Sequence, residues 1–585
     1  MKTIQVEAEF CVVGGGLAGL CAAVAAARHG TKTVLVHDRP VLGGNASSEI
    51  RVPVQGAYGS WDRSVRETGI IEEIMLETLY RNPSGNWQMW DLAMHGIAKA
   101  EPNLTLLLNC SCTEAKASEG RLESLRAWQS TTQTWFEVSA QVFADCSGDS
   151  ILSSFAGAEM RDGREAAAEF DEPLAPDVAS STKMGMSLIF VWRDLGSPQR
   201  FMPPTWIHTF HNDEEAPKHV EKINLKPVSG ANGFFVELGG EDDTIHDSEE
   251  IKEELLNLGL GLIDHYKNQG EHGAENLALE WFGFLPGKRE SLRYVGDHML
   301  RQSDVQQPNA FEDIVAYGGW PIDDHDSKGS LRKGEYSHDW FKVNCPYGIP
   351  FRSLYSKNVE NLMMAGRNIS ATHIALCTTR VMATCALLGQ AIGTAASLSI
   401  REACTPRECG QLHIEELQAS LQADDCWLPG LARAIPEPSR SASLLASSGD
   451  AELLRNGHDR EYEDRGEVNA WIAAKGAWVE YRFESPQQLS QARIVFDSNL
   501  KRKWANMPLW YPRDGWDIKP EPTLVRGFRI MAENESSEWQ EVACETDSFQ
   551  RLVRLSLDVE TKAIRLIIDE TWGHDSVKVF AWDVS

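Results

Sequence analysis

The sequence has few basic residues for its length. It contains 56 lysine and arginine residues against 85 aspartate and glutamate residues, which gives a formal net charge of −29 at pH 7. Nucleic acids and anionic membranes are bound through positive surface patches, so this charge argues against both as general partners. A chain of 585 residues is also too long for a single hydrophobic core, and we expect several domains.

Signals for secretion, membrane insertion and disulfide pairing are also missing. The N-terminus lacks a basic start, an apolar stretch and a small-residue cleavage site. The longest apolar helical run, taken as Leu17 to Ala27, is shorter than the roughly 20 residues that span a bilayer. The 12 cysteines form neither a disulfide framework nor a C-x-x-C pair. We therefore expect a cytoplasmic protein with reduced thiols.

The first forty residues contain a glycine motif between a predicted strand and a predicted helix. A short apolar strand at residues 9–13 and a second at 33–36 flank an alanine-rich helix that runs to His29. The order strand, G-x-G-x-x-G, helix, strand is typical of a dinucleotide-binding unit. The predicted contacts of this turn with the cofactor are Gly14, Gly16, Leu17, Ala18 and Gly19.

Each glycine of the motif has a physical reason. Gly14 permits the tight turn, Gly16 lets the backbone approach a pyrophosphate, and Gly19 lets helix and strand pack closely. The N-terminus of the helix attracts the phosphates. The second strand of such units usually ends in a carboxylate that binds ribose. Here His37 stands at that place and Asp38 follows, so either side chain is a candidate for the ribose contact.

The segment after the second strand indicates which dinucleotide binds. A Gly43-Gly44 pair follows that strand, as in flavoproteins whose chain turns back beneath the FAD pyrophosphate. No second G-x-G-x-x-G stands in a strand–helix context, which argues against a nicotinamide domain. Flavin disulfide reductases place two cysteines after the glycine pair, whereas this chain has none there. We predict FAD, and further contacts from this segment at Arg39, Gly44, Asn45, Ser48 and Arg51.

Later segments repeat the pattern of a strand followed by small residues. A third apolar strand at residues 142–144 precedes a Ser-Gly step, and a strand at 104–108 leads toward Thr113 and the adenine. Another strand precedes Gly366, and the apolar helix at 378–398 would direct its positive N-terminal end at the flavin. The predicted contacts from these segments are Thr113, Cys146, Ser147, Gly148, Asp149, Gly366, Arg367, Arg380 and Val381.

Three series of residues resemble a known family. They are Asp38-Arg39-Pro40-x-x-Gly43-Gly44-Asn45-x-Ser47-Ser48-Glu49-Ile50-Arg51, Leu285-Pro286-Gly287-Lys288-Arg289-Glu290-Ser291, and Gly366-Arg367-Asn368-Ile369-Ser370-x-Thr372-His373 with Arg380-Val381-Met382-x-Thr384-Cys385. Together they resemble the bacterial FAD-dependent oxidoreductases of the FAD_oxidored type over about residues 5–400. The resemblance implies the cofactor fold of the succinate dehydrogenase and fumarate reductase flavoproteins. It also implies a sugar-like substrate, because family members often lie among carbohydrate-utilisation genes.

Oxidation of a C–H bond by flavin needs a base for the second proton and cations that steady charge. We predict His373 as the base, because imidazole titrates in the right range and the residue precedes the flavin-side helix. An equally good interpretation is that His373 hydrogen-bonds to FAD or to other groups in the protein core. Arg51 and Arg380 are the predicted cations, with binding of phosphate or backbone carbonyls as the alternative. Trp281 is a candidate sugar-stacking residue, and the charged residues near it are candidates for a polar pocket. The alternative is that these charges form an internal salt-bridge network that fixes a domain joint.

The C-terminal part has short alternating strands. The clean alternation at 476–483 and further strand-like runs predict a β-sandwich. Residues 456–478 resemble the start of a discoidin (F5/8 type C), or galactose-binding-like, domain, which implies sugar binding through aromatic loops. Burial is the alternative for its aromatic residues, and the insert 501–517 is also a candidate cover for the flavin site. The candidate aromatic ligands are Trp504, Trp510, Tyr511, Trp516 and Trp572.

These observations predict an α/β fold with a Rossmann-like FAD-binding domain, an inserted α+β substrate domain and a C-terminal all-β jelly-roll sandwich. The FAD-binding domain takes residues 1–150 and 346–400, and the insert takes 151–345. A linker covers 401–442 and the sandwich 443–585.

The predicted function is an FAD-dependent dehydrogenase or oxidase that acts on a hydroxyl-bearing carbon of a saccharide, glycoside or polyol, with hydride transfer to flavin N5. Redox-neutral glycoside cleavage or elimination assisted by flavin stays open, as does a carbohydrate-binding protein with structural FAD. The electron acceptor is not identified, and a homo-oligomer is compatible with the sequence. His272 and Glu275, three residues apart, are too few ligands for a metal site, so we predict none.

Overall fold

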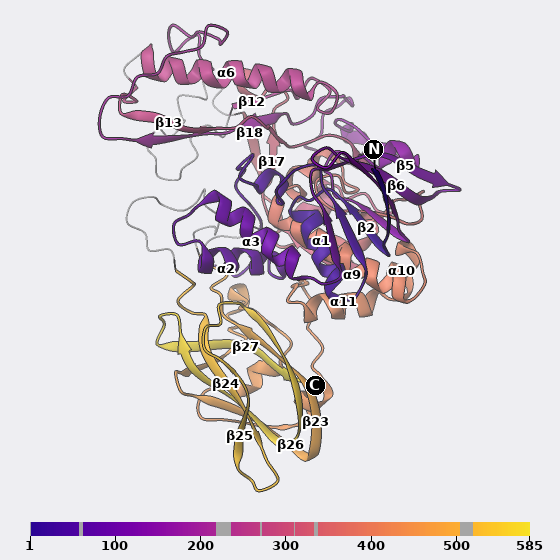
Figure 1. Ribbon diagram of the computed structural model, residues 1–585, viewed down its shortest axis with the longest axis vertical. Helices are drawn as coiled ribbons and strands as arrows, with labels where there is room; N and C mark the ends of the chain where they lie inside the picture. Colours follow the sequence, from indigo (N-terminus) through magenta and orange to yellow (C-terminus); the bar gives the residue numbers. More distant parts are fainter. Residues whose placement is uncertain are drawn as a thin grey trace. The chain divides into compact units, whose positions relative to one another are not determined.

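The structure is a computed structural model that describes residues 2–57, 63–217, 236–269, 272–308, 310–332, 337–502 and 519–585. The chain divides into two compact units (Figure 1). In the described chain, the first unit comprises residues 2–57 and 85–417, with the gaps given above. The second comprises 63–84, 418–502 and 519–585. Residues 63–84 therefore pack with the C-terminal part, although the sequence places them inside the range assigned to the FAD-binding domain.

A five-stranded parallel sheet forms the centre of the first unit. The strand order β20-β8-β2-β3-β4 puts β2 between β3 and β8. The chain therefore continues from β2 to β3 and β4 on one side, and the later strand β8 adds on the other side. β20 joins this sheet from far along the chain, so the sheet is built from two separate segments of the sequence. The strands are β2 (Phe10–Val13), β3 (Thr33–Val36), β4 (Leu104–Leu107), β8 (Val142–Asp145) and β20 (Leu362–Met364).

Two apolar helices pack closely against each other beside this sheet. A Cβ atom at Gly389 or Gly393 of α9 (Met382–Arg401) would overlap the carbonyl oxygen of Ala18 or Ala22 in α1 (Leu17–Arg28). Among the described helices, α9 is long and apolar enough to span a membrane, and 94% of its apolar window is buried inside the protein. The longest apolar helical run is thus α9, not the run at Leu17 to Ala27.

A second sheet has the order β1-β7-β6-β5. Its β6–β7 hairpin pairs Gln129 with Thr134 on either side of a polar turn. The helix α3, which contacts α1 and β4 of the parallel sheet, begins where the Asn86 side chain accepts hydrogen bonds from the backbone N–H groups of Gln88 and Met89. The elements are β1 (Lys2–Glu7), β5 (Cys110–Ser118), β6 (Arg121–Gln129), β7 (Thr134–Ser139) and α3 (Trp87–Ala100).

The part of the first unit between β8 and β20 is built from small sheets and one long helix, α6 (Ser248–Asn268). The buried face of α6 packs on β10 and β12 through residues such as Leu255 and Leu262. The sheets pair β12-β10-β14, β11-β13, β16-β19 and β17-β18. Their strands are β10 (Met186–Leu188), β11 (Phe190–Asp194), β12 (Val236–Leu238), β13 (Leu277–Phe282), β14 (Gly287–Lys288), β16 (Ile314–Gly318), β17 (Ile322–His325), β18 (His338–Phe341) and β19 (Tyr347–Pro350).

Shorter elements complete the first unit. β9 and β15 pair with each other, and α8 precedes α9. These elements are α4 (Ser153–Ala156), β9 (Met160–Arg161), α5 (Ala167–Phe170), β15 (Arg293–Tyr294), α7 (Gln302–Gln306), α8 (His373–Thr379) and α10 (Pro406–Leu412). Helix α11 (Ile414–Ala423) crosses the boundary between the units, within the predicted linker.

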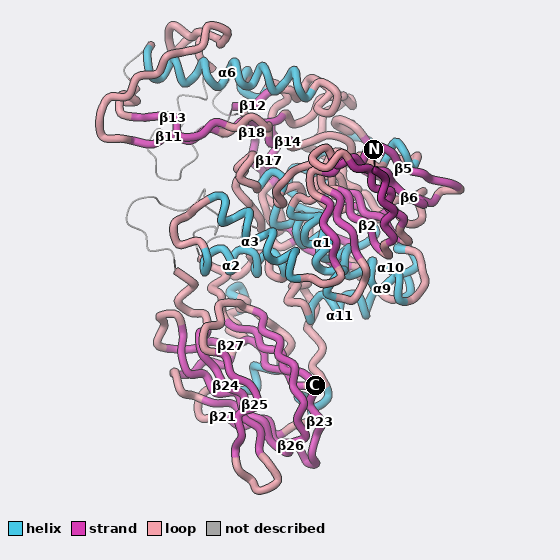
Figure 2. The backbone as a smooth tube through the Cα atoms, in the orientation of Figure 1, coloured by secondary structure: helices cyan, strands magenta, loops and turns pink. Residues whose placement is uncertain are grey.

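The second unit is mainly antiparallel β-structure, drawn in magenta in Figure 2. Register shifts interrupt the pairing of the long strands β23 and β26, and the core includes the stacked pair Tyr481 and Trp582. This confirms the all-β prediction for the C-terminal part. The elements are α2 (Ile70–Arg81), α12 (Glu437–Ser441), β21 (Ser443–Ala446), β22 (Trp471–Ala474), β23 (Trp478–Phe496), β24 (Val525–Glu533), β25 (Trp539–Glu545), β26 (Leu552–Thr571) and β27 (Ser576–Val584).

Of the aromatic residues proposed as ligands in this unit, Trp572 is described. Its indole N–H donates to the Ser548 carbonyl at 2.7 Å, and its ring lies 4.9 Å from the Arg526 guanidinium. These contacts occupy the ring within the domain. The other candidates, Trp504, Trp510, Tyr511 and Trp516, lie outside the described residues, as does most of the insert 501–517.

A buried ion pair holds α2 in the second unit. The Glu72 carboxylate accepts hydrogen bonds from the Arg502 guanidinium at 2.6 and 2.8 Å, and both side chains are buried. We expect Glu72→Ala to lower the free energy of unfolding of this unit by about 3–5 kcal/mol, because Arg502 would stay buried without its partner carboxylate. Chemical denaturation followed by tryptophan fluorescence measures this change.

Glu77→Ala on the same helix is the matched control, because Glu77 pairs with Arg81 at the surface. Exposed pairs four residues apart contribute only about 0.3–0.5 kcal/mol. Equal losses in the two variants would contradict a special role for the buried pair.

Candidate active site

A cavity of about 1210 Å³ lies in the first unit, where the central parallel strands end. Val13 of β2, Val36 of β3, Cys146 just after β8 and Gly366 after β20 all line it. The carboxyl ends of parallel strands, near the point where the strand order reverses, are the usual ligand site of such sheets. The volume exceeds the roughly 300–1,000 Å³ that holds a drug-sized ligand, so it has room for a dinucleotide.

The glycine motif makes one wall of this cavity without side chains. Gly14 has φ +99°, and a Cβ atom there would lie 2.5 Å from the Cys146 backbone. A Cβ atom at Gly19 would overlap the Gly14 carbonyl oxygen. At Gly16, by contrast, a Cβ atom would meet no protein atom within 4 Å, although Gly16 lines the cavity. The open space in front of Gly16 fits the close approach of a pyrophosphate to the backbone.

The predicted glycine pair completes this wall. The backbone N–H of Gly43 donates to the Gly15 carbonyl at 2.8 Å, which fastens the second glycine turn to the first. A Cβ atom at Gly44 would lie 3.0 Å from the Gly16 Cα, and the left-handed φ of +56° at Gly44 also favours glycine there. The two turns therefore act together as a cradle at the N-terminus of α1.

His37 supports the cradle from behind. Its Nδ1 accepts a hydrogen bond from the Gly15 backbone N–H at 3.0 Å, and its Nε2 lies 3.0 Å from the Val41 carbonyl. Burial lowers the pKa of His37, which agrees with a neutral ring that accepts at Nδ1 and donates at Nε2. Asp38 is 59% exposed and lines the cavity, so of the two residues Asp38 is the one in position to accept a ribose hydroxyl.

Three cations line the cavity near the cradle. Arg367 donates to Asp149 at 2.7 Å, and Lys288 donates to the other carboxylate oxygen at 3.0 Å. Burial raises the pKa of Asp149, but these two cations outweigh it and hold the pKa below its usual range. The buried Nη1 of Arg39 has no hydrogen-bond acceptor among the described residues. A phosphate group would satisfy that donor, so the residues present fit an anionic dinucleotide.

Most of the predicted cofactor contacts line the cavity, but Gly19, Ser48, Thr113 and Arg51 do not. Gly19 packs inside the turn, and the Thr113 hydroxyl donates to the Arg126 carbonyl. The residues on the lining are Gly14, Gly16, Leu17, Ala18, His37, Asp38, Arg39, Gly44, Asn45, Cys146, Ser147, Gly148, Asp149, Gly366, Arg367, Arg380 and Val381.

Arg51 and Trp281, both proposed for the substrate side, contact each other. The Arg51 guanidinium lies 4.1 Å from the Trp281 ring centroid and 5.0 Å from that of Trp87. Its Nε donates to the Ser48 carbonyl at 3.1 Å, and its φ of +66° is unusual for a residue with a side chain. The pair is a packed cation–π contact, in line with the structural alternative for both residues.

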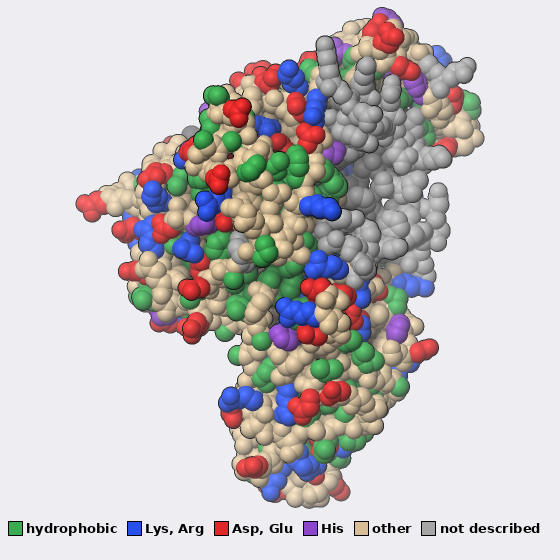
Figure 3. Space-filling view, turned by 180° about the vertical axis from the view of Figure 1, so that it is seen from behind, with side chains coloured by type: hydrophobic (Ala, Val, Ile, Leu, Met, Phe, Trp, Pro, Cys, Tyr) green, Lys and Arg blue, Asp and Glu red, His purple; other side chains and the backbone are tan. Residues whose placement is uncertain are grey.

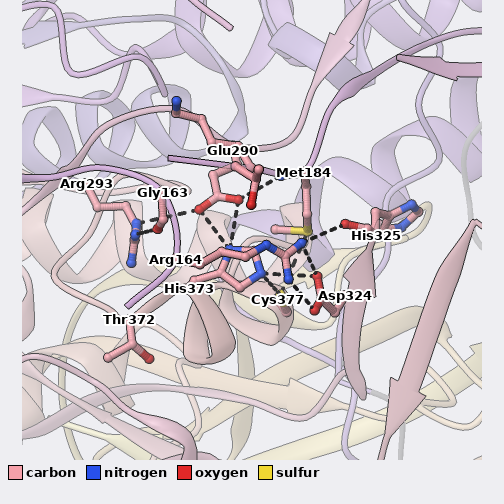
Figure 4. A network of polar contacts seen from close by, with 12 residues as sticks. Gly163, Arg164, Met184, Glu290, Arg293, Asp324, His325, Thr372, His373 and Cys377 are labelled. Atoms are coloured by element: carbon pink, nitrogen blue, oxygen red, sulfur yellow. Dashed lines mark hydrogen bonds and ion pairs between the residues drawn. The ribbon is translucent and has the colours of Figure 1, made fainter. Parts of the chain in front are cut away.

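His373 lies in a buried charge network rather than on the cavity lining (Figure 4). Its Nδ1 is 2.9 Å from a Glu290 oxygen and its Nε2 is 3.1 Å from Asp324, and the side chain is 1% exposed. Burial lowers the pKa of His373, but the Glu290 and Asp324 carboxylates overcome it and hold the pKa well above its ordinary value. The ring is thus a buried imidazolium, which fits the core interpretation better than that of a base.

The strand β17 connects this network to the cavity. Alternate side chains of a strand point to opposite faces. Asp324 points to His373 and forms a two-bond pair with Arg164 at 2.8 and 2.9 Å. Asp323 and His325 line the cavity instead. His373 therefore holds β17 in place, and the other face of β17 presents Asp323 and His325 to the cavity.

Those groups form an acid–base cluster, defined as Glu237, Arg289, Asp323, His325, His338 and Arg380. His325 is held between two carboxylates, with Nδ1 2.9 Å from Glu237 and Nε2 3.2 Å from Asp323. Arg289 pairs with Glu237 at 2.6 Å, and Arg380 pairs with Asp323 at 3.2 Å. The His338 ring centroid is 5.2 Å from that of His325, and all members except Glu237 line the cavity.

The protonation states in the cluster differ from one group to the next. Burial lowers the pKa of His338 from its ordinary 6.5, which leaves the ring neutral near pH 7. Burial raises the pKa of Asp323, but His325 and Arg380 overcome it and hold the carboxyl ionised. Glu237 is buried as well, but Arg289 and His325 lower its pKa to about 2. A neutral imidazole thus lies beside ionised carboxylates.

Two tryptophans lie next to the cluster on the cavity lining. The Trp340 indole N–H donates to Asp323 at 2.6 Å, and the rings of Trp320 and Trp340 meet edge to face at 5.5 Å. Apart from Arg380, neither the members of the cluster nor these two rings are among the site residues predicted from the sequence. The one local signal is the density of Asp and His in Ile322-Asp323-Asp324-His325-Asp326 and His338-Asp339-Trp340.

Comparison with known proteins gives one family and several small solved domains. The family model described as "FAD dependent oxidoreductase" matches residues 9–421. Among curated proteins, none matches the chain.

Several of the solved structures that match are carbohydrate-binding modules. The family 32 module of Streptococcus pneumoniae EndoD is 12% identical and covers 25% of this chain and 95% of its own, with a TM-score of 0.20. A chitosan-binding module from a Paenibacillus sp. IK-5 chitosanase/glucanase is also 12% identical and covers 25% and 94%, with a TM-score of 0.17. The family 32 module of C. perfringens NanJ, solved with galactose, is 12% identical and covers 25% and 95%, with a TM-score of 0.18. We draw no function from these likenesses.

Proposed function

The chain belongs to the FAD-dependent oxidoreductase family, and on that premise we propose that it oxidises a hydroxyl-bearing carbon of a saccharide, glycoside or related polyol. The observation that carries this proposal is the acid–base cluster. It shares one cavity with the glycine cradle, so a substrate beside the cluster also lies near a dinucleotide bound at the cradle. FAD, when bound, supplies a hydride acceptor at flavin N5.

His338 is the proposed base in place of His373. Its ring lines the cavity and its lowered pKa keeps it able to accept a proton from the substrate hydroxyl at neutral pH. Asp323, with its ionised carboxylate, stabilises the imidazolium that results. Arg289 and Arg380 keep the two carboxylates of the cluster ionised through their ion pairs.

The electrostatics of the cavity also favour negative charge on a bound flavin. Val381 and Met382 line the cavity at the N-terminus of α9, and a helix N-terminus carries a partial positive charge. Arg380 stands just before this end. This arrangement stabilises charge that develops on the cofactor side as the substrate is oxidised.

The aromatic rings support a sugar-like substrate. Trp320 and Trp340 offer apolar faces to the C–H groups of a sugar ring, while Asp323 and Arg289 offer acceptors and donors to its hydroxyls. Trp340 is 53% exposed and remains accessible to a ligand that enters from solvent.

The proposal is tested by an anaerobic titration of the purified flavoprotein with mono- and oligosaccharides, glycosides, sugar acids and polyols. Loss of the visible flavin band with one compound class identifies the hydride donor. A protein that contains no flavin after expression and reconstitution contradicts the cofactor assignment. Flavin that no compound reduces, together with cleaved glycoside products, would instead establish the redox-neutral alternative.

Trp340→Ala is expected to raise KM for the saccharide about 10-fold and to change kcat much less. The lost ring contact acts in the ground state and transition state alike, and such uniform binding appears in KM. Steady-state kinetics with the donor found above measures both constants. Trp206→Ala is the control, because Trp206 is similarly exposed at 56% and does not line the cavity. An unchanged KM in Trp340→Ala would contradict the stacking role.

A further inference from the structure

A second cluster of ligand-type side chains lies at the far end of α6. His265 is in the last turn of this helix, Asp213 stands between β11 and β12 in the chain, and His272 follows the helix. His265 Nε2 is 2.8 Å from Asp213 Oδ1, and His272 Nε2 is 3.4 Å from the same oxygen. One ligand atom from each residue lies within 4.8 Å of the other two.

The orientation of His265 is fixed from behind. Its Nδ1 lies 2.9 Å from the Phe210 carbonyl, and the side chain is 3% exposed. A hydrogen bond from one ring nitrogen to a backbone carbonyl sets the tautomer and presents the lone pair of the other nitrogen. This is the usual support of a histidine that binds a metal.

His272 supplies an independent observation. Its Nε2 is shielded from solvent and makes no hydrogen bond to any described residue, although it lies 3.4 Å from Asp213 Oδ1. The ring lies with its centroid 4.8 Å from that of His265. A cation between the rings and Asp213 would satisfy the Nε2 atom.

We propose that Asp213, His265 and His272 bind one divalent transition-metal ion, with zinc as the best match. Two imidazoles and one carboxylate are typical zinc ligands, whereas calcium and magnesium prefer oxygen alone. Two ligands of a tetrahedral zinc ion are about 3.3 Å apart, given metal–ligand distances of about 2.0–2.1 Å. The observed separations bracket this value, and a water molecule completes the fourth position.

The proposed ion has a structural role. The first residues of α6, Ser248 and Glu249, line the cavity, and His265 lies about 25 Å along the helix from Ser248 at 1.5 Å per residue. The ion joins the loop around Asp213 and the turn at His272 to the last turn of α6. Lys267 already ties this turn to the helix by donating to the Ala274 and Leu277 carbonyls at 2.7 Å each.

The acid–base cluster in the cavity is a poorer cation site, although Asp323, His325 and His338 also lie close together. The guanidinium groups of Arg289 and Arg380 neutralise the carboxylates there and repel a second cation. No such cation pairs with Asp213 among the described residues.

The test uses the full-length flavoprotein after chelation and dialysis. We expect isothermal titration with Zn²⁺ and elemental analysis to find one zinc per chain. His272→Gln is expected to weaken binding by more than about 100-fold, since even outer contacts of metal ligands change affinity roughly 10- to 100-fold. His246→Gln is the matched control, because His246 pairs with Asp243 at 2.8 Å near the other end of α6 without a third ligand.

Equal zinc affinity in the wild type, His272→Gln and Asp213→Asn would overturn the proposal, as would loss of binding in His338→Asn but not in His272→Gln. Because His265→Gln removes a buried side chain and risks misfolding, hydrogen exchange of the wild type provides a second measurement. Zinc is expected to slow exchange in residues 210–216 and 272–277. Unchanged exchange in both segments at saturating zinc would also contradict the site.

Discussion

Replacing His338 with asparagine is expected to slow reduction of the bound flavin by about 10²- to 10⁴-fold. This is the usual contribution of a general base that takes a proton in the transition state. Asparagine keeps a polar side chain of similar size but accepts no proton. Stopped-flow absorbance under anaerobic conditions with the best saccharide donor measures the rate of flavin reduction. Measurement at saturating donor separates this rate from the affinity for the donor.

The pH dependence gives this prediction a second, sharper form. Burial lowers the pKa of His338 from 6.5, and the neutral ring is the form that accepts a proton. The neutral form dominates above that lowered pKa and is lost as the pH falls through it. We therefore expect kcat/KM to be level near pH 7 and to fall on the acid side below 6.5 in the wild type. His338→Asn should lack this acid limb.

His208→Asn is a suitable control, because His208 pairs with Glu254 at the surface and does not line the cavity. It should keep both the rate and the profile. His373→Asn distinguishes the two candidate histidines. Loss of the acid limb in His373→Asn, with the limb retained in His338→Asn, would reverse the assignment of the base. A slower rate with an unchanged limb in His373→Asn fits its role in positioning β17.

The glycine cradle can be predicted from the sequence because it is built from local patterns. Gly14, Gly16 and Gly19 stand within one turn, and the apolar runs beside them identify the strand and helix that hold this turn. A parallel sheet then brings its strand ends to the same edge, so Asp149 and Arg367 are predicted to lie near the cofactor from two distant segments. Short-range patterns and one general rule of sheet topology are sufficient here.

The end of the cavity with the acid–base cluster depends on tertiary pairing, and its one local signal is the density of Asp and His on β17 and β18. Asp323 and His338 lie on this antiparallel pair of strands, whereas Glu237 and Arg380 come from segments far from it in the chain, and β17 is too short for its alternation to stand out. His373 illustrates the reverse case. It is the first residue of α8 and precedes α9, and the two carboxylates that surround it, Glu290 and Asp324, come from other segments and make it a buried cation.

The helix α2 shows the same limit at the level of domains. Its apolar pattern indicates that it packs on something, but the pattern does not say on what. Glu72 finds its partner Arg502 more than four hundred residues later, and the pair places α2 in the second unit. A boundary drawn from composition alone assigns such a segment to its neighbours in sequence.

Gly16→Ala is expected to weaken FAD binding by roughly 10- to 100-fold and to leave the apoprotein as stable as the wild type. The φ of −63° at Gly16 suits alanine, and a Cβ atom there meets no protein atom within 4 Å. The added methyl group instead occupies the space that the pyrophosphate needs, and such overpacking costs about 1–3 kcal/mol. Fluorescence titration of the apoprotein with FAD measures affinity, and thermal unfolding of the apoprotein measures stability.

Two other glycines separate crowding of the cofactor from damage to the fold. Gly96→Ala in α3 also adds a methyl group to open space, but Gly96 does not line the cavity, so it should keep both affinity and stability. Gly19→Ala would press its Cβ atom against the Gly14 carbonyl oxygen, so it should lose both together. Only a cofactor that lies directly against Gly16 makes that position lose affinity alone. If Gly16→Ala binds FAD as tightly as Gly96→Ala does, the cradle does not hold the pyrophosphate. The assignment of His338 as the base then fails as well, because it requires the cofactor to lie at the cradle.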